Sequence, residues 1–280
     1  MSVSEFLYTV VCRPAPIRRV VNYLILAFLP KSVRIGRAEI VLNPHDPVVS
    51  GALAMGVYEK EEISLFSRTI QPGMTVVDVG ANLGAYSSVA LDRLQGQGQL
   101  LAIEPAKENF LWLQRNLKKN RVLSLKTKVH AVRAALSSKA GVAVLHKNPA
   151  NKGDNRLYPD GLLAGMEKVE TTTLDALCLQ KGIRSIDILK IDVQGLEGEV
   201  LAGSQRILRA SRCCHLFLEF WAEGMRKAKT DPRLIAKLLK SLGFVLYTYS
   251  CGSLIPIQVR FLVRQTSGRN YVNLYGVRRG

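Results

Sequence analysis

The sequence predicts an α/β protein with a doubly wound, mostly parallel, Rossmann-like sheet. Short apolar runs of strand length alternate with amphipathic segments of helix length through most of the chain, which is the order of βαβ units. The first of these strands, Thr75–Val79, is rich in β-branched residues and leads directly into a glycine-rich turn. A length of 280 residues, 48% of them hydrophobic, allows one large α/β core.

The spacing of the apolar residues predicts each element in order. We expect strands at residues 75–79, 99–103, 128–132, 142–146, 186–191, 215–220, 244–249 and 271–277. We expect helices at residues 59–69, 107–119, 196–209 and 232–242, and a polar loop at 147–165. We divide the chain into a basic, partly apolar helical N-terminal extension, residues 1–50, and a domain formed by residues 51–280.

The turn after the first strand indicates a site for a small polar cofactor. Gly80 and Gly84 remove side chains where the backbone must bend and where a ligand would approach it. A dinucleotide site has the spacing G-x-G-x-x-G, whereas this turn has Asn82 at the middle position, which favours S-adenosylmethionine over NAD. The candidate cofactor-binding residues of the turn are Asp78, Gly80, Ala81, Asn82 and Gly84.

The second strand supplies a carboxylate to the same site. It leads into Glu104, which is followed by Pro105, and an acid at this strand tip can accept hydrogen bonds from both hydroxyls of a ribose. An NAD site uses an acid in the same way, so Glu104 supports S-adenosylmethionine only together with the glycine turn. We add Glu104 and Pro105 to the candidate cofactor-binding residues.

A longer segment carries a resemblance to a known family. The sequence Asp187-Ile-Leu-Lys-Ile-Asp-Val-Gln-Gly-Leu-Glu-Gly-Glu-Val-Leu-Ala-Gly203 resembles the signature of the FkbM family of S-adenosylmethionine-dependent methyltransferases. The segments Gly56-Val-Tyr-Glu59, Glu104-Pro105, Ala134-Ala-Leu-Ser137 and Thr173-Leu-Asp175 are similar to further motifs of the family and follow its order. Together these segments cover roughly residues 51–225.

The resemblance has implications for the fold, the cofactor and the acceptor. It implies a class I methyltransferase with a seven-stranded sheet and an acceptor hydroxyl on a sugar, glycolipid or other natural product. It also implies that Ala135 and Leu136 lie beside the adenine of the cofactor. One residue departs from the family pattern, because Gln194 occupies a position that is commonly Glu. We therefore assign the chemistry to other residues.

Four residues are candidates for catalysis. Lys190 and Asp192 are two positions apart near the carboxyl end of a strand, so both side chains project from one side of it toward the cofactor crevice. Asp192 is for this reason also a candidate cofactor-binding residue. Glu197 lies in the first turn of the next helix, where helix capping is an equal alternative. By resemblance, Glu219 lies at the tip of the following strand.

Asp192 and Glu219 fit two kinds of chemistry. As neighbours in one pocket, the two acids can act as a general base for a substrate hydroxyl, or they can hold a divalent metal ion that acidifies the hydroxyl. The sequence leaves both open. For Lys190 and Asp192, a purely structural ion pair is a further alternative.

Cysteines and histidines argue against other classes of site. The 5 cysteines lack C-x-x-C spacing and the 4 histidines are scattered, so neither a zinc site nor a disulfide framework is indicated. We expect a location in the reducing cytoplasm.

The charge of the chain is concentrated at its two ends. Residues 1–38 carry six Lys or Arg and one acid, and residues 232–280 carry eight and none, within a formal net charge of +17. This favours an anionic partner, which leaves a membrane, a glycan and a nucleic acid open. The basic-flanked apolar run between Pro14 and Pro30 is too short to span a bilayer. It either packs on the core as a helix or docks on a membrane surface, which would make the protein peripheral at the inner face of a membrane.

These observations lead to one predicted function and two alternatives. We predict an S-adenosylmethionine-dependent methyltransferase that acts on an oxygen of a small-molecule, glycan or glycolipid acceptor. An RNA methyltransferase is the first alternative, favoured by the net charge, although the chain lacks an Asn/Asp-Pro-Pro-aromatic motif. A non-catalytic S-adenosylmethionine-binding protein is the second, supported by Gln194 alone. The sequence identifies neither the acceptor nor the oligomeric state.

Overall fold

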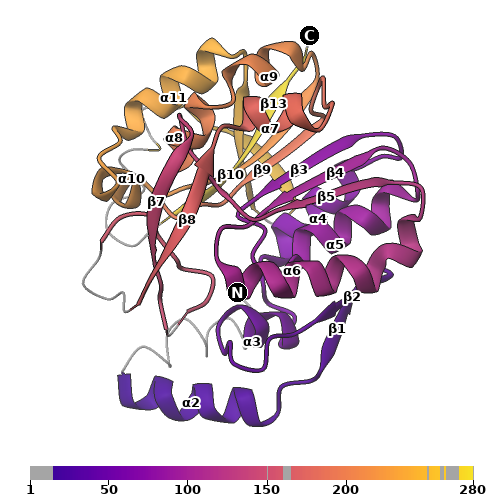
Figure 1. The fold of residues 1–280 in the computed structure, drawn as a ribbon, viewed down its shortest axis with the longest axis vertical. Helices are drawn as coiled ribbons and strands as arrows, with labels where there is room; N and C mark the ends of the chain where they lie inside the picture. The colour runs from indigo at the N-terminus through magenta and orange to yellow at the C-terminus, as the bar shows by residue number, and fades with distance from the viewer. Residues whose placement is uncertain are drawn as a thin grey trace.

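A computed structural model describes residues 15–149, 151–159, 165–250, 252–258, 262 and 271–279. Within these residues the centre of the molecule is an 8-stranded sheet with the strand order β12-β11-β13-β10-β9-β3-β4-β5 (Figure 1). Its strands are β3 (Thr75–Val79), β4 (Gln99–Ile103), β5 (Lys128–Val132), β9 (Ile188–Ile191), β10 (Cys214–Phe220), β11 (Val245–Ser250), β12 (Ser253–Pro256) and β13 (Val272–Arg278).

Strand directions in the sheet confirm the predicted fold class. β5, β4, β3, β9 and β10 are parallel neighbours, and β13 lies antiparallel between β10 and β11. The predicted closing hairpin is therefore present as β11 and β13. The short strand β12 extends the predicted seven strands to eight by pairing with the outer edge of β11.

Helices cover both faces of the sheet, as a doubly wound fold requires (Figure 1). One face carries α4 (Lys60–Thr69), α5 (Ala85–Leu94) and α6 (Lys107–Asn120). The other face carries α7 (Leu174–Gln180), α8 (Glu197–Ala202), α9 (Gln205–Ala210) and α11 (Pro232–Ser241). Two short helices, the 3-10 helix η2 (Arg121–Ser124) and α10 (Ala222–Lys227), complete this part of the chain.

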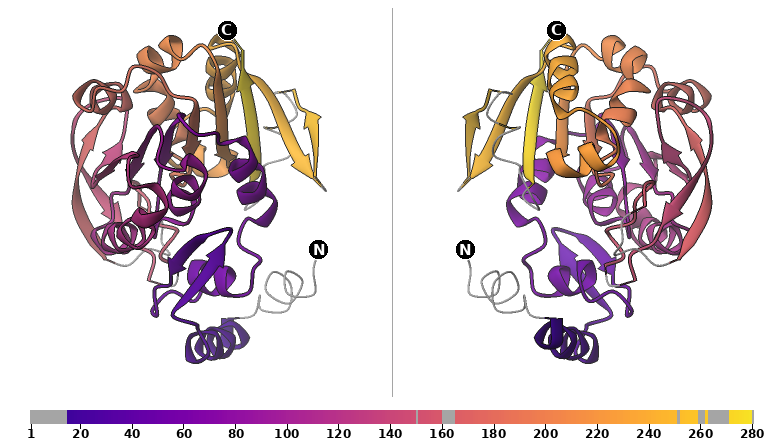
Figure 2. Two further views of the ribbon diagram at one scale, coloured as in Figure 1. Left: turned by 90° about the vertical axis from the view of Figure 1, so that its right-hand side faces the viewer. Right: turned by 90° about the vertical axis from the view of Figure 1, so that its left-hand side faces the viewer.

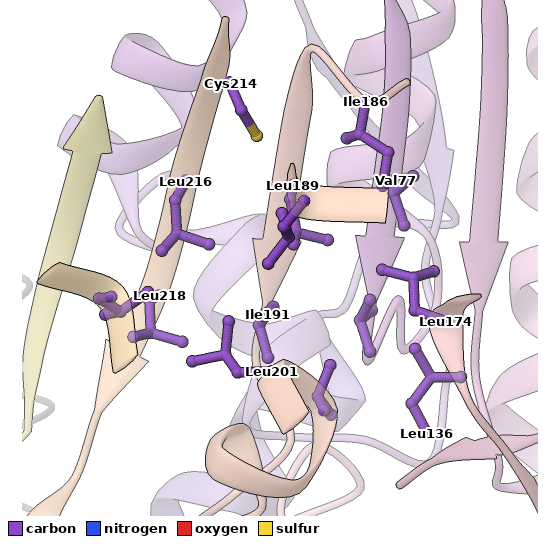
Figure 3. Close-up of a cluster of buried hydrophobic side chains, with 14 of the residues drawn as sticks. Val77, Leu136, Leu174, Ile186, Leu189, Ile191, Leu201, Cys214, Leu216 and Leu218 are labelled. Carbon is purple, nitrogen blue, oxygen red and sulfur yellow. The ribbon is translucent and has the colours of Figure 1, made fainter. Parts of the chain in front are cut away.

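Alternation along the strands divides the core between the two faces. Val77 and Leu189 pack toward α7, α8 and α9, whereas their neighbours Val76 and Ile188 pack toward α4, α5 and α6. Figure 3 shows the first of these clusters, in which Leu201 of α8 meets side chains of the strands. All five of these side chains are fully buried, which explains why apolar residues occupy both faces of these strands.

A separate 3-stranded sheet packs beside the central one. It consists of β6 (Ala135–Leu136), β7 (Gly141–His146) and β8 (Met166–Thr172), in the order β6-β8-β7. The strand β8 was not expected, because its charged residues Glu167, Lys168 and Glu170 hide the apolar pattern. Pairing with β7 along six residues stabilises it instead.

The predicted helix at 196–209 is wrong, because two helices occupy this segment. α8 ends at Ala202 and α9 begins at Gln205. At Gly203, between the two helices, the chain passes close to the small sheet. A Cβ atom on Gly203 would collide with the carbonyl oxygen of Ser137. The helix is interrupted at this close approach.

The N-terminal segment contains a helix and a hairpin that is fastened to the core. It forms α2 (Ala15–Ala27), β1 (Ser32–Ile35), β2 (Ala38–Val41) and α3 (Val49–Ala54), which lie below the sheet in Figure 2. The backbone N–H groups of Glu39 and Val41 donate to Asn120 and Asn116 of α6 at 2.8 and 2.7 Å. The predicted division at residue 50 stays a prediction, and α3 spans it.

The helix α2 corresponds to the basic-flanked apolar run. Among the described residues, no helix is long and apolar enough to cross a bilayer. Of the basic residues at the chain ends, Arg13, Arg260, Arg264 and Arg269 lie outside the described residues.

The packing of α5 against α6 gives a testable prediction for Gly84→Ala. Gly84 has φ +90°, and a Cβ atom there would lie 2.8 Å from Cδ1 of Leu113. The matched control Gly182→Ala has φ +67° but open space around the new Cβ. We expect Gly182→Ala to lower the free energy of unfolding by about 1–2 kcal/mol from backbone strain alone. Gly84→Ala should cost about 1–3 kcal/mol more, since it also overpacks the helix contact. Urea denaturation measures both, and equal losses would contradict this packing role.

Candidate functional site

A cavity lies at the carboxyl ends of β3, β4 and β9. This is the position at which open α/β sheets bind their ligands. Of the predicted cofactor-binding residues, seven line this cavity: Gly80, Asn82, Glu104, Pro105, Ala135, Leu136 and Asp192. Segments from four parts of the sequence thus meet at one hollow, as the motif order predicted.

The glycine turn lets the backbone of β3 pass close to the end of β9. Gly80 has φ +77°, and a Cβ atom on it would collide with the carbonyl oxygen of Asp192. The N–H groups of Gly80 and Ala81 both donate to the carbonyl of Ile103, at 3.0 Å. The turn is therefore fixed to the two neighbouring strands, and its sharp bend leaves the space that the cavity occupies.

Three predicted residues lie behind the cavity wall. Asp78 is buried under the turn, where its Oδ2 accepts a hydrogen bond of 2.6 Å from Ser87. Ala81 is also buried and does not line the cavity. Gly84 faces Leu113 of α6, so its absent side chain makes room for a helix and not for a ligand.

Glu104 reaches the cavity from a buried position. Its Oε2 accepts from the N–H of Asn82 and its Oε1 accepts from the N–H of Ala106, both at 2.9 Å. Burial raises the pKa of Glu104 to about 7, although these backbone donors lower it. A carboxylate offers about four lone-pair directions, so two donors leave acceptor capacity on both oxygens.

Beside this cavity, Lys190 is surrounded by buried carboxylates. Its Nζ lies 3.4 Å from Oδ2 of Asp192 and 4.4 Å from the ring centroid of Tyr86. The predicted projection of Lys190 and Asp192 to one side of the strand is thus present in the structure. Burial alone would lower the pKa of Lys190, but the carboxylates of Asp192, Glu59, Asp78 and Glu62 together raise it.

Two of these carboxylates, Glu59 and Glu62, were missed as site residues. Oε2 of Glu59 accepts a hydrogen bond of 2.6 Å from the hydroxyl of Tyr86, and Glu59 itself has φ +41°, in the left-handed region. Oε2 of Glu62 accepts from Asn273 at 2.5 Å, and burial followed by the charge of Glu59 raises the pKa of Glu62 to about 8. The motif Gly56-Val-Tyr-Glu59 was a signal for Glu59, whereas Glu62 looks in sequence like an ordinary surface charge of a helix.

Gln194 joins the two acids that the sequence suggested as one pocket. Its Nε2 donates to Oδ1 of Asp192 at 2.9 Å and to Oε2 of Glu219 at 3.1 Å. Burial, followed by the charge of Asp192, raises the pKa of Glu219 well above its usual range. Because the amide donates to both carboxylates, it reduces their mutual repulsion, which a Glu at this position would increase.

Neither a metal centre nor catalysis by Glu197 gains support from the geometry. Within the described part of the chain, no group of three or more His, Cys, Asp or Glu side chains is arranged to hold a metal ion. Oε1 of Glu197 accepts from the N–H groups of Gly195 and Val193 at 3.0 and 3.3 Å. These bonds brace the turn after β9, and Glu197 does not line the cavity. The contacts of Glu197 therefore favour a structural role at the start of α8 over a catalytic one.

The polar loop after β7 closes one side of the cavity with Gly153, Asn155 and Leu157. The hydroxyl of Tyr158 donates to the carbonyl of Gln194 at 3.0 Å, which ties this loop to the turn after β9. The guanidinium of Arg156 lies 4.9 Å from the ring centroid of Trp221. The loop therefore connects the cavity wall to the region that follows β10.

A profile of the methyltransferase FkbM domain matches residues 78–246, which is more than half of the chain. The chain belongs to the FkbM methyltransferase family. The match includes the glycine turn, Glu104, Lys190, Asp192, Gln194 and Glu219. The predicted family and the class I methyltransferase fold are thereby confirmed.

Several curated relatives are similar in sequence to part of this chain. Methyltransferase sdnD of Sordaria araneosa is 33% identical over 157 residues, which are 46% of this chain and 59% of sdnD. The 2-O-methyltransferase NoeI of Sinorhizobium fredii is 26% identical over 192 residues, 62% of this chain and 74% of NoeI. Ribosomal RNA large subunit methyltransferase E of Methylobacillus flagellatus is 43% identical over 54 residues, 19% of this chain and 26% of that enzyme. The chain thus spans less than two thirds of sdnD.

The side chains that line the cavity fit S-adenosylmethionine, the cofactor that the family implies. Glu104 offers oxygens to a ribose, and Leu136, Leu145 and Ile103 supply apolar surface for an adenine ring. S-Adenosylmethionine carries a sulfonium and an ammonium group, and buried carboxylates compensate positive charge. Oδ1 of Asp78 is buried without a hydrogen-bond partner, which is consistent with a region that is short of positive charge.

The raised pKa of Glu104 predicts that cofactor affinity depends on pH. Because the ionised carboxylate is the stronger acceptor, affinity for S-adenosylmethionine should rise as pH increases through about 7. Glu104→Gln should bind roughly tenfold to a hundredfold more weakly and lose this pH dependence. Calorimetry at several pH values measures both effects. Glu61→Gln, on the exposed side of α4, is the matched control, and unchanged affinity in Glu104→Gln would contradict the assignment.

Proposed function

We propose that this FkbM methyltransferase uses S-adenosylmethionine to methylate a hydroxyl oxygen on a sugar, glycolipid or other natural product. One observation carries the proposal: Glu104, Asp192 and Gln194 line the same cavity. Gln194 also donates hydrogen bonds to both Asp192 and Glu219, which connects the cavity to this pair of acids. Such a connection supports a cofactor subsite next to a proton acceptor.

The residues of the chain have separate tasks in this proposal. S-Adenosylmethionine, when bound, supplies an activated methyl group on its sulfonium sulfur. Glu104 accepts hydrogen bonds from the ribose, and the apolar wall around Leu136 holds the adenine. The loop with Asn155 and Leu157 keeps water from that side of the cavity. The protein's main contribution is therefore alignment of the acceptor oxygen with the methyl carbon.

The acid pair takes the proton of the acceptor hydroxyl. Burial and neighbouring carboxylates raise the pKa of Glu219 well above its usual range, so its ionised form is a stronger base than an exposed carboxylate. The proton passes from the hydroxyl oxygen to a carboxylate oxygen of Asp192 or Glu219. Gln194 holds both acids in place through its amide group. In this account Gln194 is a positioning residue, so its departure from the commoner Glu is compatible with activity.

The relative NoeI is a 2-O-methyltransferase, which supports an oxygen as the acceptor atom. The family resemblance supports a natural product as the acceptor molecule. An RNA methyltransferase is the second candidate. It is favoured by the net charge of +17 and by the 54-residue match to a ribosomal RNA methyltransferase. Purified RNA and a glycolipid extract, offered as acceptors with labelled S-adenosylmethionine, distinguish the two candidates by which fraction gains the label.

The roles of the acid pair predict how two variants behave. Asp192→Asn and Glu219→Gln should each lower turnover by at least about a hundredfold and leave affinity for S-adenosylmethionine within a few-fold. Release of S-adenosylhomocysteine in the presence of the acceptor extract measures turnover, and calorimetry measures affinity. Asp231→Asn is the matched control, because it changes an acid that caps α11, and Asn caps a helix equally well.

Three results would contradict this assignment. Turnover close to that of the wild type in both variants would move the base to Glu59. A wild-type protein that binds S-adenosylmethionine but never forms S-adenosylhomocysteine with any acceptor fraction would favour the non-catalytic alternative. Loss of activity on addition of a chelator, restored by a divalent ion, would replace the general base with a metal site.

A further inference from the structure

A second cavity lies between the N-terminal hairpin and the helices α4 and α5. It shares no lining residue with the cofactor cavity. Ile35 of β1, Leu53 of α3 and Ile63 of α4 give it an apolar wall. Tyr58 also lines it and lies near the carboxylate of Glu59. The second cavity is therefore next to the carboxylates around Lys190 but separate from the cofactor cavity.

The polar lining of this cavity is basic. Arg34 of β1, Lys60 and Arg68 of α4, and Arg93 of α5 contribute to it, and no acidic residue does. Within the part of the chain that the structure describes, none of these four side chains has a carboxylate partner within 4.0 Å. Nε of Arg93 donates to the carbonyl of Ser67 at 3.0 Å, which holds that guanidinium in position. Four basic side chains therefore gather here without a direct ion pair, and the nearest acid of the hairpin is Glu39, which lies opposite Arg34 on the neighbouring strand.

An apolar helix face is exposed at the same end of the molecule. Val20, Tyr23, Leu24 and Phe28 follow a helical spacing along α2 and just beyond it, and Phe28 is 83% exposed. Leu29, the next residue, packs in one cluster with Leu53, Val33 and Ile35, which also line the second cavity. Leu29 thus links α2 to the hairpin side of the basic cavity, and Figure 1 shows α2 at the bottom with β1 and β2 above it.

We infer that the second cavity binds the phosphate headgroup of an anionic lipid while α2 lies along the surface of the bilayer. Arginine side chains recognise phosphate oxygens in paired hydrogen bonds, and the apolar wall suits the glycerol and upper acyl region of a lipid. An exposed apolar stripe on a short helix suits the interface of a bilayer. A free phosphate would use the basic side chains and leave this stripe without a function.

This inference goes beyond methyl transfer and does not depend on it. It gives a specific place to the anionic partner that the charge of the chain predicts. Among the candidates that the sequence left open, the combination of an apolar helix face with a basic cavity favours a membrane. Nucleic-acid binding uses stacking aromatic and basic side chains along a groove, and only Tyr58 among the lining residues is aromatic.

Vesicle co-sedimentation tests the inference with the full chain. Vesicles of phosphatidylcholine that contain phosphatidic acid should bind the protein, and vesicles of phosphatidylcholine alone should bind it weakly. The double variant Arg34→Gln, Arg68→Gln should weaken binding to the acidic vesicles roughly thirtyfold, since each basic side chain contributes on the order of 1 kcal/mol at an anionic surface.

The matched control removes the same charge from outside the second cavity. Arg184 and Arg212 are exposed, and neither lines the second cavity or the cofactor cavity. Arg184→Gln, Arg212→Gln should change vesicle binding only a few-fold. A second double variant, Tyr23→Ser, Phe28→Ser, should weaken vesicle binding without a change of net charge. Thermal unfolding and affinity for S-adenosylmethionine should stay unchanged in all three, because none of these residues lies in the cofactor cavity.

Three results would overturn the inference. Equal losses in the two arginine pairs would mean that overall charge attracts the vesicles. Full competition by inorganic phosphate, with no effect of the Tyr23 and Phe28 changes, would assign the cavity to a soluble phosphate compound. Short RNA that displaces the acidic vesicles and loses affinity in the Arg34 and Arg68 variant would assign the surface to a nucleic acid.

Discussion

The pairing of one buried ammonium with several buried carboxylates constrains the rest of the site. Lys190 lies on a central strand, and its charge is balanced by Asp192, Glu59, Asp78 and Glu62. A buried carboxylate without such a partner is costly, so the cluster depends on Lys190 and on the protons that the acids retain. The cluster joins β3, β9 and α4, and it therefore couples the stability of the fold to the charge state of the site. A bound cationic cofactor adds a second source of compensation.

The doubly wound sheet explains why these groups meet. Parallel strands end at the same edge, and alternation along β3 and β9 directs Asp78 and Lys190 to the face covered by α5. The bend at Gly80 then opens the cavity next to them. Gln194 supplies a neutral hydrogen-bond donor between two acids at this end of the sheet, because its amide donates to both Asp192 and Glu219. In the proposed function, binding and proton transfer therefore both use the carboxyl ends of neighbouring strands.

The sequence was sufficient for the parts of the fold and site that depend on local chemistry. β-Branched runs and the glycine turn predicted β3, β4, β9 and the cofactor cavity, because a buried parallel strand and a sharp turn each require particular residue types. The contacts of Glu62 and Gln194 were not predictable, since their partners Asn273 and Glu219 are distant in sequence. Gly84 was assigned to the ligand because a glycine that makes room for a helix has the same local signature as one that makes room for a cofactor. The strand β8 depends on pairing with β7 and leaves no clear apolar pattern of its own.

The most direct test of the account is the pH dependence of stability in Lys190→Met. Between pH 5 and 8 the carboxyl groups with raised pKa values, including Glu104 and Glu197 at about 7 and Glu62 at about 8, lose their protons. A folded-state pKa above the unfolded value means that the free energy of unfolding falls as pH rises through this range. Removing Lys190 should make that fall steeper, with a loss of about 3–5 kcal/mol at pH 8 and a much smaller loss at pH 5. Urea denaturation at the two pH values measures it, and Lys126→Met, at an exposed lysine, is the control. A loss in Lys190→Met that is the same at both pH values would contradict the central role of this charge.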